Sequence, residues 1–152
     1  MGDVPYEELP ERLQRMPSRL LAQTAAQGQR IVGEALSAHD ARTHHYAVLA
    51  ALAEFGPASQ SAIADRTGIY RSDLVATLNE LADRDLTRRA PDPDDRRRNV
   101  ITLTPAGRRH LRRLDTTLGR AQDRLLAPLD DRERATLTAL LTRVLTHHTA
   151  TG

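Results

Sequence analysis

The spacing of apolar residues predicts a mostly helical chain. Between Ser18 and Ala38, apolar side chains recur at the three- and four-residue spacing of an amphipathic helix, and a second such helix is predicted from Thr43. This second helix should end at Gly56-Pro57, because that pair breaks helices. Upstream of Ser18, prolines interrupt the pattern, so we expect any early helix to be interrupted and the first residues to be frayed.

A helix-turn-helix is predicted in the middle of the chain. Ser59 can cap a short helix that runs to Thr67, and Gly68 suits the left-handed position that ends a helix. A further helix is predicted from Arg71 to Arg84. Its buried stripe is formed by Leu74, Leu78 and Leu81. Two helices joined by a tight glycine-containing turn are typical of this motif.

After these helices the apolar period changes from 3.6 to 2. Residues 86–90 and 99–103 read as two short strands, and the charged segment 91–98 between them is rich in turn formers. Thr104-Pro105 then provides an N-cap and a first-turn proline for a new helix, and a last helix is predicted from about Asp130. The expected fold class is therefore mainly α with a small β-hairpin.

The helix after Pro105 carries a seam of the coiled-coil type. Its apolar residues are spaced alternately by three and four and comprise Leu111, Leu114, Leu118, Ala121 and Leu125. Such a seam needs a partner helix, which can belong to the same chain or to a second copy. Because the globular body is small, we expect a homodimer.

The net charge of +2 hides a local concentration of basic residues. Residues 88–113 contain nine Arg and three Asp, whereas the rest of the chain has more acidic than basic residues. This asymmetry indicates a polyanion bound at one place, although a charge-rich segment can also be merely solvated.

Composition and motifs narrow the function further. The chain has no Cys, which excludes disulfides and thiolate chemistry, and it has no apolar run long enough to span a membrane and no secretory leader. No glycine loop, nucleophile elbow or zinc-protease motif is present, so we expect neither an enzyme nor a cofactor. A cytoplasmic, mostly helical protein is the expectation.

A helix-turn-helix followed by a hairpin predicts a winged helix that binds double-stranded DNA. The exposed positions at the start of its second helix are expected to reach base edges, and they are Arg71, Ser72, Asp73, Val75 and Ala76. At the hairpin tip, Arg96, Arg97 and Arg98 can enter a narrow minor groove. We expect Asp95 to orient Arg97 through a bidentate ion pair. The alternative is a solvated turn whose charges pair with one another.

These residues resemble the multiple-antibiotic-resistance-regulator (MarR) family of winged-helix repressors. The resemblance runs from Tyr46-Ala-Val-Leu through Arg71-Ser-Asp and Asp92-Pro-Asp-Asp-Arg-Arg97 to Leu103-Thr-Pro-Ala-Gly107. It implies a six-helix obligate dimer on a pseudo-palindromic operator, with Asp95 and Arg97 as the wing pair. It also places Ser59, Gln60 and Ser61 at the start of the preceding helix, whose amides suit a phosphate.

Two positions depart from the family pattern. Many relatives have Asp where this chain has Tyr70, so an expected N-cap of the recognition helix is lost, and Ser72 or water can substitute. Relatives often carry Arg or Ser around Val75 and Ala76, so base readout here should be either weaker or more methyl-directed. Both departures concern the operator sequence and leave the fold unaffected.

The resemblance also implies a small-molecule cleft between the dimer arms and the DNA-binding lobe. Arg19 is expected to pair with a carboxylate there, while His44 or His45 and Tyr46 hold a ring and a hydroxyl. The sequence supports an alternative equally well, in which Arg19 and the histidines only link the arms within the dimer. No metal site is expected, because Ala106 and Leu114 stand four residues on either side of His110, where a second histidine ligand would lie.

The sequence thus predicts one domain, residues 1–152, with three parts. Residues 18–54 form the arm and cleft helices, 55–104 the winged-helix lobe, and 105–148 the dimerisation helices. The expected function is that of a homodimeric, sequence-specific transcriptional regulator, a repressor released from its operator by a small, aromatic ligand. The alternative is a winged helix used for protein contacts or for non-specific, architectural DNA binding.

Overall fold

The computed structural model describes residues 4–150 and is mainly helical with one antiparallel hairpin, which confirms the expected fold class. The elements follow in the order η1 (Tyr6–Glu8), α1 (Glu11–Gln14), α2 (Pro17–Ser37), α3 (Thr43–Phe55), α4 (Gln60–Thr67), α5 (Arg71–Asp83), β1 (Thr87–Pro91), β2 (Asn99–Leu103), α6 (Pro105–Leu125) and α7 (Asp131–Thr149). The early helices η1 and α1 are short, as the prolines predict. The expected fraying of the first residues falls on residues 1–3, which lie outside the described part.

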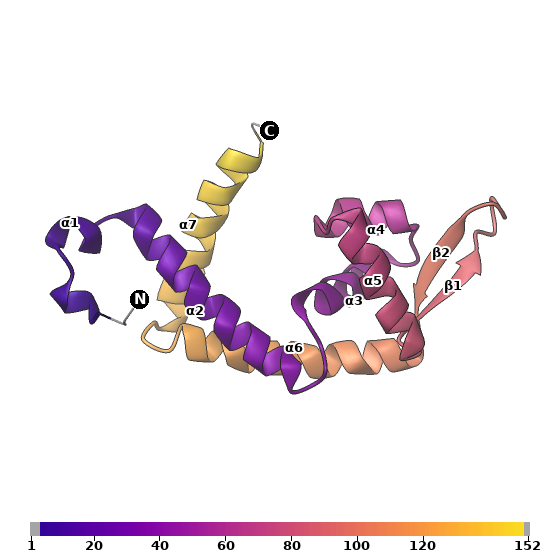
Figure 1. The fold of residues 1–152 in the computed structure, drawn as a ribbon, viewed down its shortest axis with the longest axis horizontal. Helices are drawn as coiled ribbons and strands as arrows, with labels where there is room; N and C mark the ends of the chain where they lie inside the picture. Colours follow the sequence, from indigo (N-terminus) through magenta and orange to yellow (C-terminus); the bar gives the residue numbers. More distant parts are fainter. Residues whose placement is uncertain (1–3, 151–152) are drawn as a thin grey trace.

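Helix α6 runs along the middle of the molecule's long axis and joins two groups of elements (Figure 1). Helices α3, α4 and α5 and the hairpin gather at the end where α6 begins. Helices α1, α2 and α7 lie at the end where α6 finishes. The chain therefore has a winged-helix lobe at one end and a helical arm at the other.

Local capping groups fix several helix ends, and the sequence predicts those at Ser59, Gly68 and Thr104 but not the one at Asp130. The Ser59 hydroxyl accepts from the Ala62 amide at 3.2 Å, and Gly68 ends α4 with a φ of 69°. Thr104 caps α6 by accepting from the Gly107 amide at 2.9 Å. At the start of α7, the Asp130 carboxylate accepts from the Glu133 amide in a reciprocal capping box.

The core of the lobe is aliphatic and lies between α3, α4, α5, β2 and α6. Its fully buried members include the predicted stripe of α5 and residues of the neighbouring helices, namely Leu49, Leu52, Ile63, Leu74, Leu78, Leu81 and Leu114. Burying side chains of this size contributes about 1.5–3 kcal/mol each to folding. The orientation of α5, and of everything it exposes, is fixed by this packing.

The apolar seam of α6 is covered within the chain. Leu111, Leu114 and Ala121 are buried, and α6 packs along α2 and against α3. The expectation that a second copy covers this seam is therefore wrong for these three residues.

Helix α7 leaves an apolar face uncovered. None of its residues is buried, and the exposed side chains include Leu140, Leu141, Val144 and Leu145, the last with 66% of its surface exposed. Together with α2 and the end of α6, this face lines a largely apolar groove of about 700 Å³. In Figure 1, α7 rises away from the rest of the chain.

The hairpin pairs Thr87 with Leu103 and Pro91 with Asn99. Its second strand has the predicted bounds 99–103, whereas the first begins at Thr87, one residue later than predicted. An additional bridge lies beside it, because the Ile101 amide donates to the Ala58 carbonyl at 2.8 Å and the Ala58 amide donates back at 3.1 Å. The bridge ties the base of the hairpin to the segment that precedes α4. The sequence analysis did not predict it.

The start of α6 approaches the end of the α5–β1 connection very closely. The Thr104 hydroxyl donates to the Asp85 carbonyl at 2.7 Å, and the Thr104 amide donates to the Leu86 carbonyl at 3.2 Å. A Cβ atom at position 107 would lie 2.1 Å from the Leu86 carbonyl oxygen and 2.6 Å from Leu103 Cδ1. Only glycine fits at Gly107 without a shift of backbone.

Candidate nucleic-acid interface

One face of α5 is free of packing and carries all five predicted recognition residues. Leu74, Leu78 and Leu81 face the core together with Thr77, whose hydroxyl donates to the Asp73 carbonyl at 2.8 Å. The residues left exposed are Arg71, Ser72, Asp73, Val75 and Ala76. Small polar and methyl-bearing side chains at the start of a helix can approach base edges closely.

Within residues 4–150, no side chain caps the N-terminus of α5. Tyr70 occupies the N-cap position, its side chain is 81% exposed, and no side chain accepts from the first amides of the helix. The expected substitution by Ser72 does not occur. The first-turn amides of α5 therefore remain available to an acceptor such as a phosphate oxygen.

Helix α4 precedes the recognition helix, and its first turn reaches the surface. Ser59 and Gln60 are partly buried and Ser61 is exposed, and Ser59 already uses its hydroxyl as the cap. Arg66 lies over the exposed Phe55 ring, with its guanidinium carbon 4.7 Å from the ring centroid, which joins α4 to the end of α3. The sequence analysis missed this contact, because no local sequence pattern indicates it.

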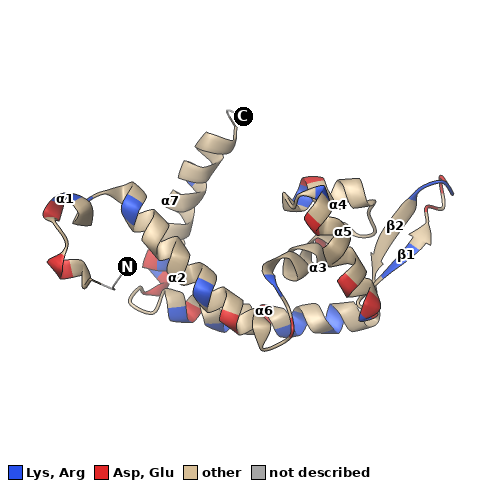
Figure 2. Ribbon diagram, viewed as in Figure 1, with Lys and Arg blue, Asp and Glu red and all other residues tan. Residues whose placement is uncertain are grey.

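The wing tip is held by its own backbone and aspartates. The Asp92 amide donates to the Arg98 carbonyl at 2.7 Å, and the Asp94 amide donates to the Asp92 carboxylate at 2.9 Å. Arg96, Arg97 and Arg98 are all exposed at this tip, where Figure 2 shows the basic and acidic residues side by side.

The expected bidentate ion pair between the Asp95 and Arg97 side chains is wrong in this structure. The Asp95 carboxylate accepts instead from the Arg97 backbone amide at 3.1 Å, and its other oxygen lies 3.9 Å from Nε of Arg98. An aspartate in a tight turn bonds to the amide two residues later more readily than it orders a long side chain. Within residues 4–150, the Arg97 guanidinium has no ion-pair partner.

Helix α5 is anchored at its far end to the start of α3 by one ion pair and one hydrogen bond. Glu80 accepts from the Arg42 guanidinium and from Nε2 of His45, the latter at 2.6 Å. Nδ1 of His45 accepts from the Arg42 amide at 2.9 Å, which caps α3. Since Nδ1 accepts and Nε2 donates, His45 is neutral with both nitrogens satisfied. Its pKa is lowered, mainly by burial.

A second tie joins α5 to the loop between α2 and α3. The Arg84 guanidinium donates to the Asp40 carbonyl at 2.7 Å and to the His39 carbonyl at 3.3 Å. His110 of α6 is buried close by, and its Nε2 has no hydrogen-bond partner among the described residues. Burial lowers the pKa of His110, and the positive charges of Arg84 and Arg113 add to this effect. Sequence reasoning missed Glu80 and Arg84, whose partners lie more than 30 residues away.

The four residues expected to bind a ligand lie in different surroundings. His44 is exposed, whereas His45 is buried in the contacts just described. The Tyr46 hydroxyl donates to Asp115 of α6 at 2.7 Å, and this bond, together with burial, raises the pKa of Tyr46 to about 12.

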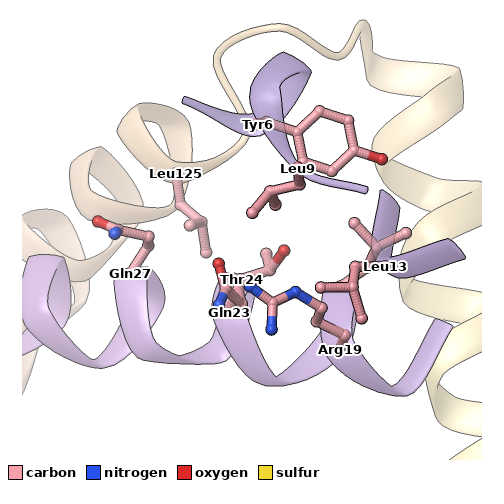
Figure 3. Close-up of a pocket in the computed structure, with 9 residues that line it drawn as sticks. Tyr6, Leu9, Leu13, Arg19, Gln23, Thr24, Gln27 and Leu125 are labelled. Atoms are coloured by element: carbon pink, nitrogen blue, oxygen red, sulfur yellow. The ribbon is translucent and has the colours of Figure 1, made fainter. Parts of the chain in front are cut away.

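Arg19 lies far from these three residues within the chain. It lines a cavity between the N-terminal segment and α2 (Figure 3). Ser37, at the end of α2, follows Arg19 by 18 helical steps, which span about 27 Å, so one chain does not bring Arg19 to the start of α3. Among residues 4–150, no three His, Asp or Glu side chains converge in a way that could hold a metal ion. No helix in the described part combines the length and apolarity needed to cross a membrane.

Comparisons with known proteins agree with this geometry. A model described as "MarR family" matches residues 39–98, which cover α3 to the wing. A candidate transcriptional regulatory protein for the hcr operon of Thauera aromatica is 36% identical over 99 residues, 65% of this chain and 60% of that protein. The chain thus spans less than two thirds of this curated relative.

Solved structures extend the similarity to the arm. A candidate transcriptional regulator of Pseudomonas aeruginosa superposes with a TM-score of 0.77 at 28% identity, covering 88% of this chain and 99% of that one. PcaV of Streptomyces coelicolor, solved in complex with its natural ligand, gives 0.74 at 29% identity, covering 95% and 97%. Residues 39–98 therefore match the MarR family, and with its helix-turn-helix, wing and long α6 in one unbroken order the chain has the fold of the MarR winged-helix proteins.

Proposed function

We propose that the protein is a transcriptional regulator that binds double-stranded DNA as a homodimer and represses the genes beside its operator. The observation that carries this proposal is the pair of free, DNA-compatible surfaces on the lobe. The unpacked face of α5 presents Arg71, Ser72 and Val75, and the wing tip presents unpaired Arg97. A helix in the major groove and a basic wing in the minor groove use these surfaces together.

The two surfaces would contact different parts of the DNA. Side chains of α5 reach base edges, where Ser72 can hydrogen bond and Val75 and Ala76 can contact thymine methyl groups. The open amides at the start of α5, the first amides of α4 near Gln60 and Ser61, and the wing arginines contact phosphates and the minor groove. Asp73 is tolerated at the interface as an acceptor from cytosine or as a partner for Arg71.

The uncovered face of α7 supports the homodimer. Helix α7 exposes Leu140, Val144 and Leu145 beside a 700 Å³ apolar groove, a surface typical of an interaction site, and a second copy of the same face would cover both. The two recognition helices of such a dimer would read half-sites about 34 Å apart, one turn of DNA. Light scattering should give twice the mass of the chain at micromolar concentration.

A small molecule is proposed to control the binding. PcaV, which shares the fold and 29% of its residues, was solved with its natural ligand bound. A ligand of this protein would release DNA by binding more tightly to an arrangement of the lobes that does not fit the half-site spacing.

A competition assay tests the proposal. Labelled DNA from the promoter next to the coding gene is bound by the purified protein, and unlabelled promoter DNA or random duplex is added. A sequence-specific regulator should prefer its own site by about 1,000-fold or more. Equal competition by random duplex would indicate an architectural DNA-binding protein instead. Absence of DNA binding altogether would indicate a winged helix used for protein contacts.

A further inference from the structure

The first turns of α6 carry a dense group of basic side chains. Four arginines lie close together in the sequence and all four are exposed, whereas the two residues between them are buried. They are Arg108, Arg109, Arg112 and Arg113, and we call them the α6 arginine patch. The sequence analysis counted them in the basic segment 88–113 but gave them no role.

The patch lies on the far side of the lobe from the recognition surfaces. Helix α3 packs against both α4 and α6, so the core of the lobe lies between those two helices. Figure 1 shows α4 and the wing tip on one side of the lobe and α6 along the other. The end of α5, not its start, leads to α6, and the 13 residues of α5 place its first residue about 18 Å from its last. A duplex held at the start of α5 is therefore out of reach of the patch.

Within residues 4–150, no acidic side chain forms an ion pair with the patch, and no side-chain hydrogen bond reaches its guanidinium groups. The two aspartates of α6 are engaged elsewhere. Asp115 accepts from the Tyr46 hydroxyl at 2.7 Å, and Asp123 pairs with Arg134 at 2.7 Å. Figure 2 accordingly shows basic residues on successive turns at this end of α6.

This arrangement of charge works against the stability of α6. The patch contains two pairs of arginines four residues apart, a spacing at which like charges destabilise a helix. The first turn of α6, all of it in the described part, contains no acidic residue to offset them. The positive charge also acts on the buried His110, whose pKa is lowered first by burial and then by Arg84 and Arg113. A bound polyanion would relieve this repulsion.

The surroundings of the patch favour the backbone of double-stranded DNA as that polyanion. The patch extends over about 7.5 Å of the helix axis, and DNA carries one phosphate per about 1.7 Å, so the patch can face roughly four phosphates. Along α6, which the structure describes in full, no large apolar side chain and no Phe, Tyr or Trp ring is exposed. Protein partners anchor on such side chains and single strands stack on such rings, whereas backbone phosphates need only the charged arginine fork.

We propose that the α6 arginine patch binds the phosphate backbone of a second DNA segment while α5 and the wing hold the operator. Each copy in the proposed dimer would present one patch, so the operator complex would join two duplexes or two distant sites on one DNA molecule. This inference goes beyond the proposed function, which needs only one duplex.

A fluorescence-anisotropy titration measures the second contact on the preformed operator complex. The full chain is mixed with one unlabelled promoter duplex per dimer, and a labelled random duplex is the probe. The promoter duplex keeps the probe from the recognition surfaces, because a sequence-specific regulator prefers its own site by about 1,000-fold. We expect the complex to bind the probe with an affinity that falls steeply as salt rises.

The double variant Arg109→Gln/Arg112→Gln should lower the affinity for the probe at least about tenfold at low salt. It should also reduce the slope of log affinity against log salt by about 1.8, for two lost phosphate contacts. Arg120→Gln/Arg124→Gln is the matched control, because it removes the same charge from exposed positions further along α6 and should change neither quantity. All three proteins should bind the promoter duplex itself equally and melt at the same temperature.

A pull-down shows whether the two duplexes are joined. Promoter duplex fixed to beads should retain the labelled random duplex in the presence of the parent or the control variant, and much less with Arg109→Gln/Arg112→Gln. No retention by the parent, or equal retention by the parent and the patch variant, would overturn the proposal.

Two other results would also overturn it. Weaker binding of the promoter duplex by the patch variant would mean that the patch contacts the operator itself. Tighter patch-dependent binding of polyglutamate than of duplex would indicate an acidic protein as the partner. If the parent shows no preference for the promoter, the proposed function fails instead, and a pull-down with random duplex in both positions still decides the role of the patch.

Discussion

Replacing Gly107 by alanine should destabilise the protein strongly, against the ordinary preference of helices for alanine. A Cβ atom there would lie 2.1 Å from the Leu86 carbonyl oxygen, well inside van der Waals contact. The oxygen belongs to the backbone and accepts from the Thr104 amide, so it cannot rotate away. Either α6 or the start of β1 has to move.

The size of the effect follows from two opposed contributions. Overpacking of a tight site costs about 1–3 kcal/mol, and a backbone contact this short lies at the upper end of that range. Alanine offsets about 1 kcal/mol of this through its helix propensity. The net loss should be about 2 kcal/mol, which lowers the melting temperature of a chain of this size by roughly 4–8 °C.

Gly119→Ala on the same helix is the matched control. Gly119 is exposed, and a Cβ atom there would meet nothing within 4 Å, so this variant should be about 1 kcal/mol more stable than the parent. Thermal unfolding followed by circular dichroism gives both values, and it is done at equal protein concentration because the proposed dimerisation would make stability depend on concentration. A Gly107→Ala variant that melts at or above the parent temperature would refute the close approach of α6 to Leu86.

Three further predictions concern DNA binding, pH and assembly. Arg97→Ala should weaken DNA binding and flatten the slope of log affinity against log salt by about 0.9 for each lost phosphate contact; Arg124→Ala, at the far end of α6, should change neither in fluorescence anisotropy. Burial lowers the pKa values of His45 and His110 below 6.5, so the unfolded chain binds more protons, and stability that is complete above pH 6.5 should fall as the pH drops below it. His110→Leu should reduce that fall in pH-dependent melting; an unchanged pH profile would contradict the role of His110. Val144→Asp should shift the light-scattering mass toward the monomer, whereas the dimer should persist in a Thr142→Asp control.

Much of the fold is predictable from the sequence because its determinants are local. Ser59, Thr104 and Asp130 cap helices within three residues of themselves, and Gly68 ends α4 through its own φ. The inward stripe of α5 likewise follows from helical spacing alone.

The features that the sequence analysis did not predict depend on contacts between distant segments. The Ala58–Ile101 bridge and the His45–Glu80 hydrogen bond join residues that only the packing of the lobe brings together. The α6 seam has the spacing of a dimer contact, but spacing does not tell which helix covers it, and α2 does so within the chain. The proposed ligand residues illustrate the same point, because the length of α2 separates Arg19 from α3 in a way that residue types do not reveal.

Because α6 is long, the position of the DNA-binding lobe depends sensitively on the packing of the arm. One uninterrupted helix of 21 residues connects the wing to the arm and behaves as a stiff rod about 30 Å long. Tilting such a rod by about 5° at the arm moves its other end by roughly 2.6 Å, close to the 3.4 Å separation of neighbouring base pairs. Small changes in the packing of leucines at the arm would therefore displace the DNA-binding lobe by a distance close to one base-pair step. Selection for a fixed operator spacing should therefore act on arm residues that never touch a base.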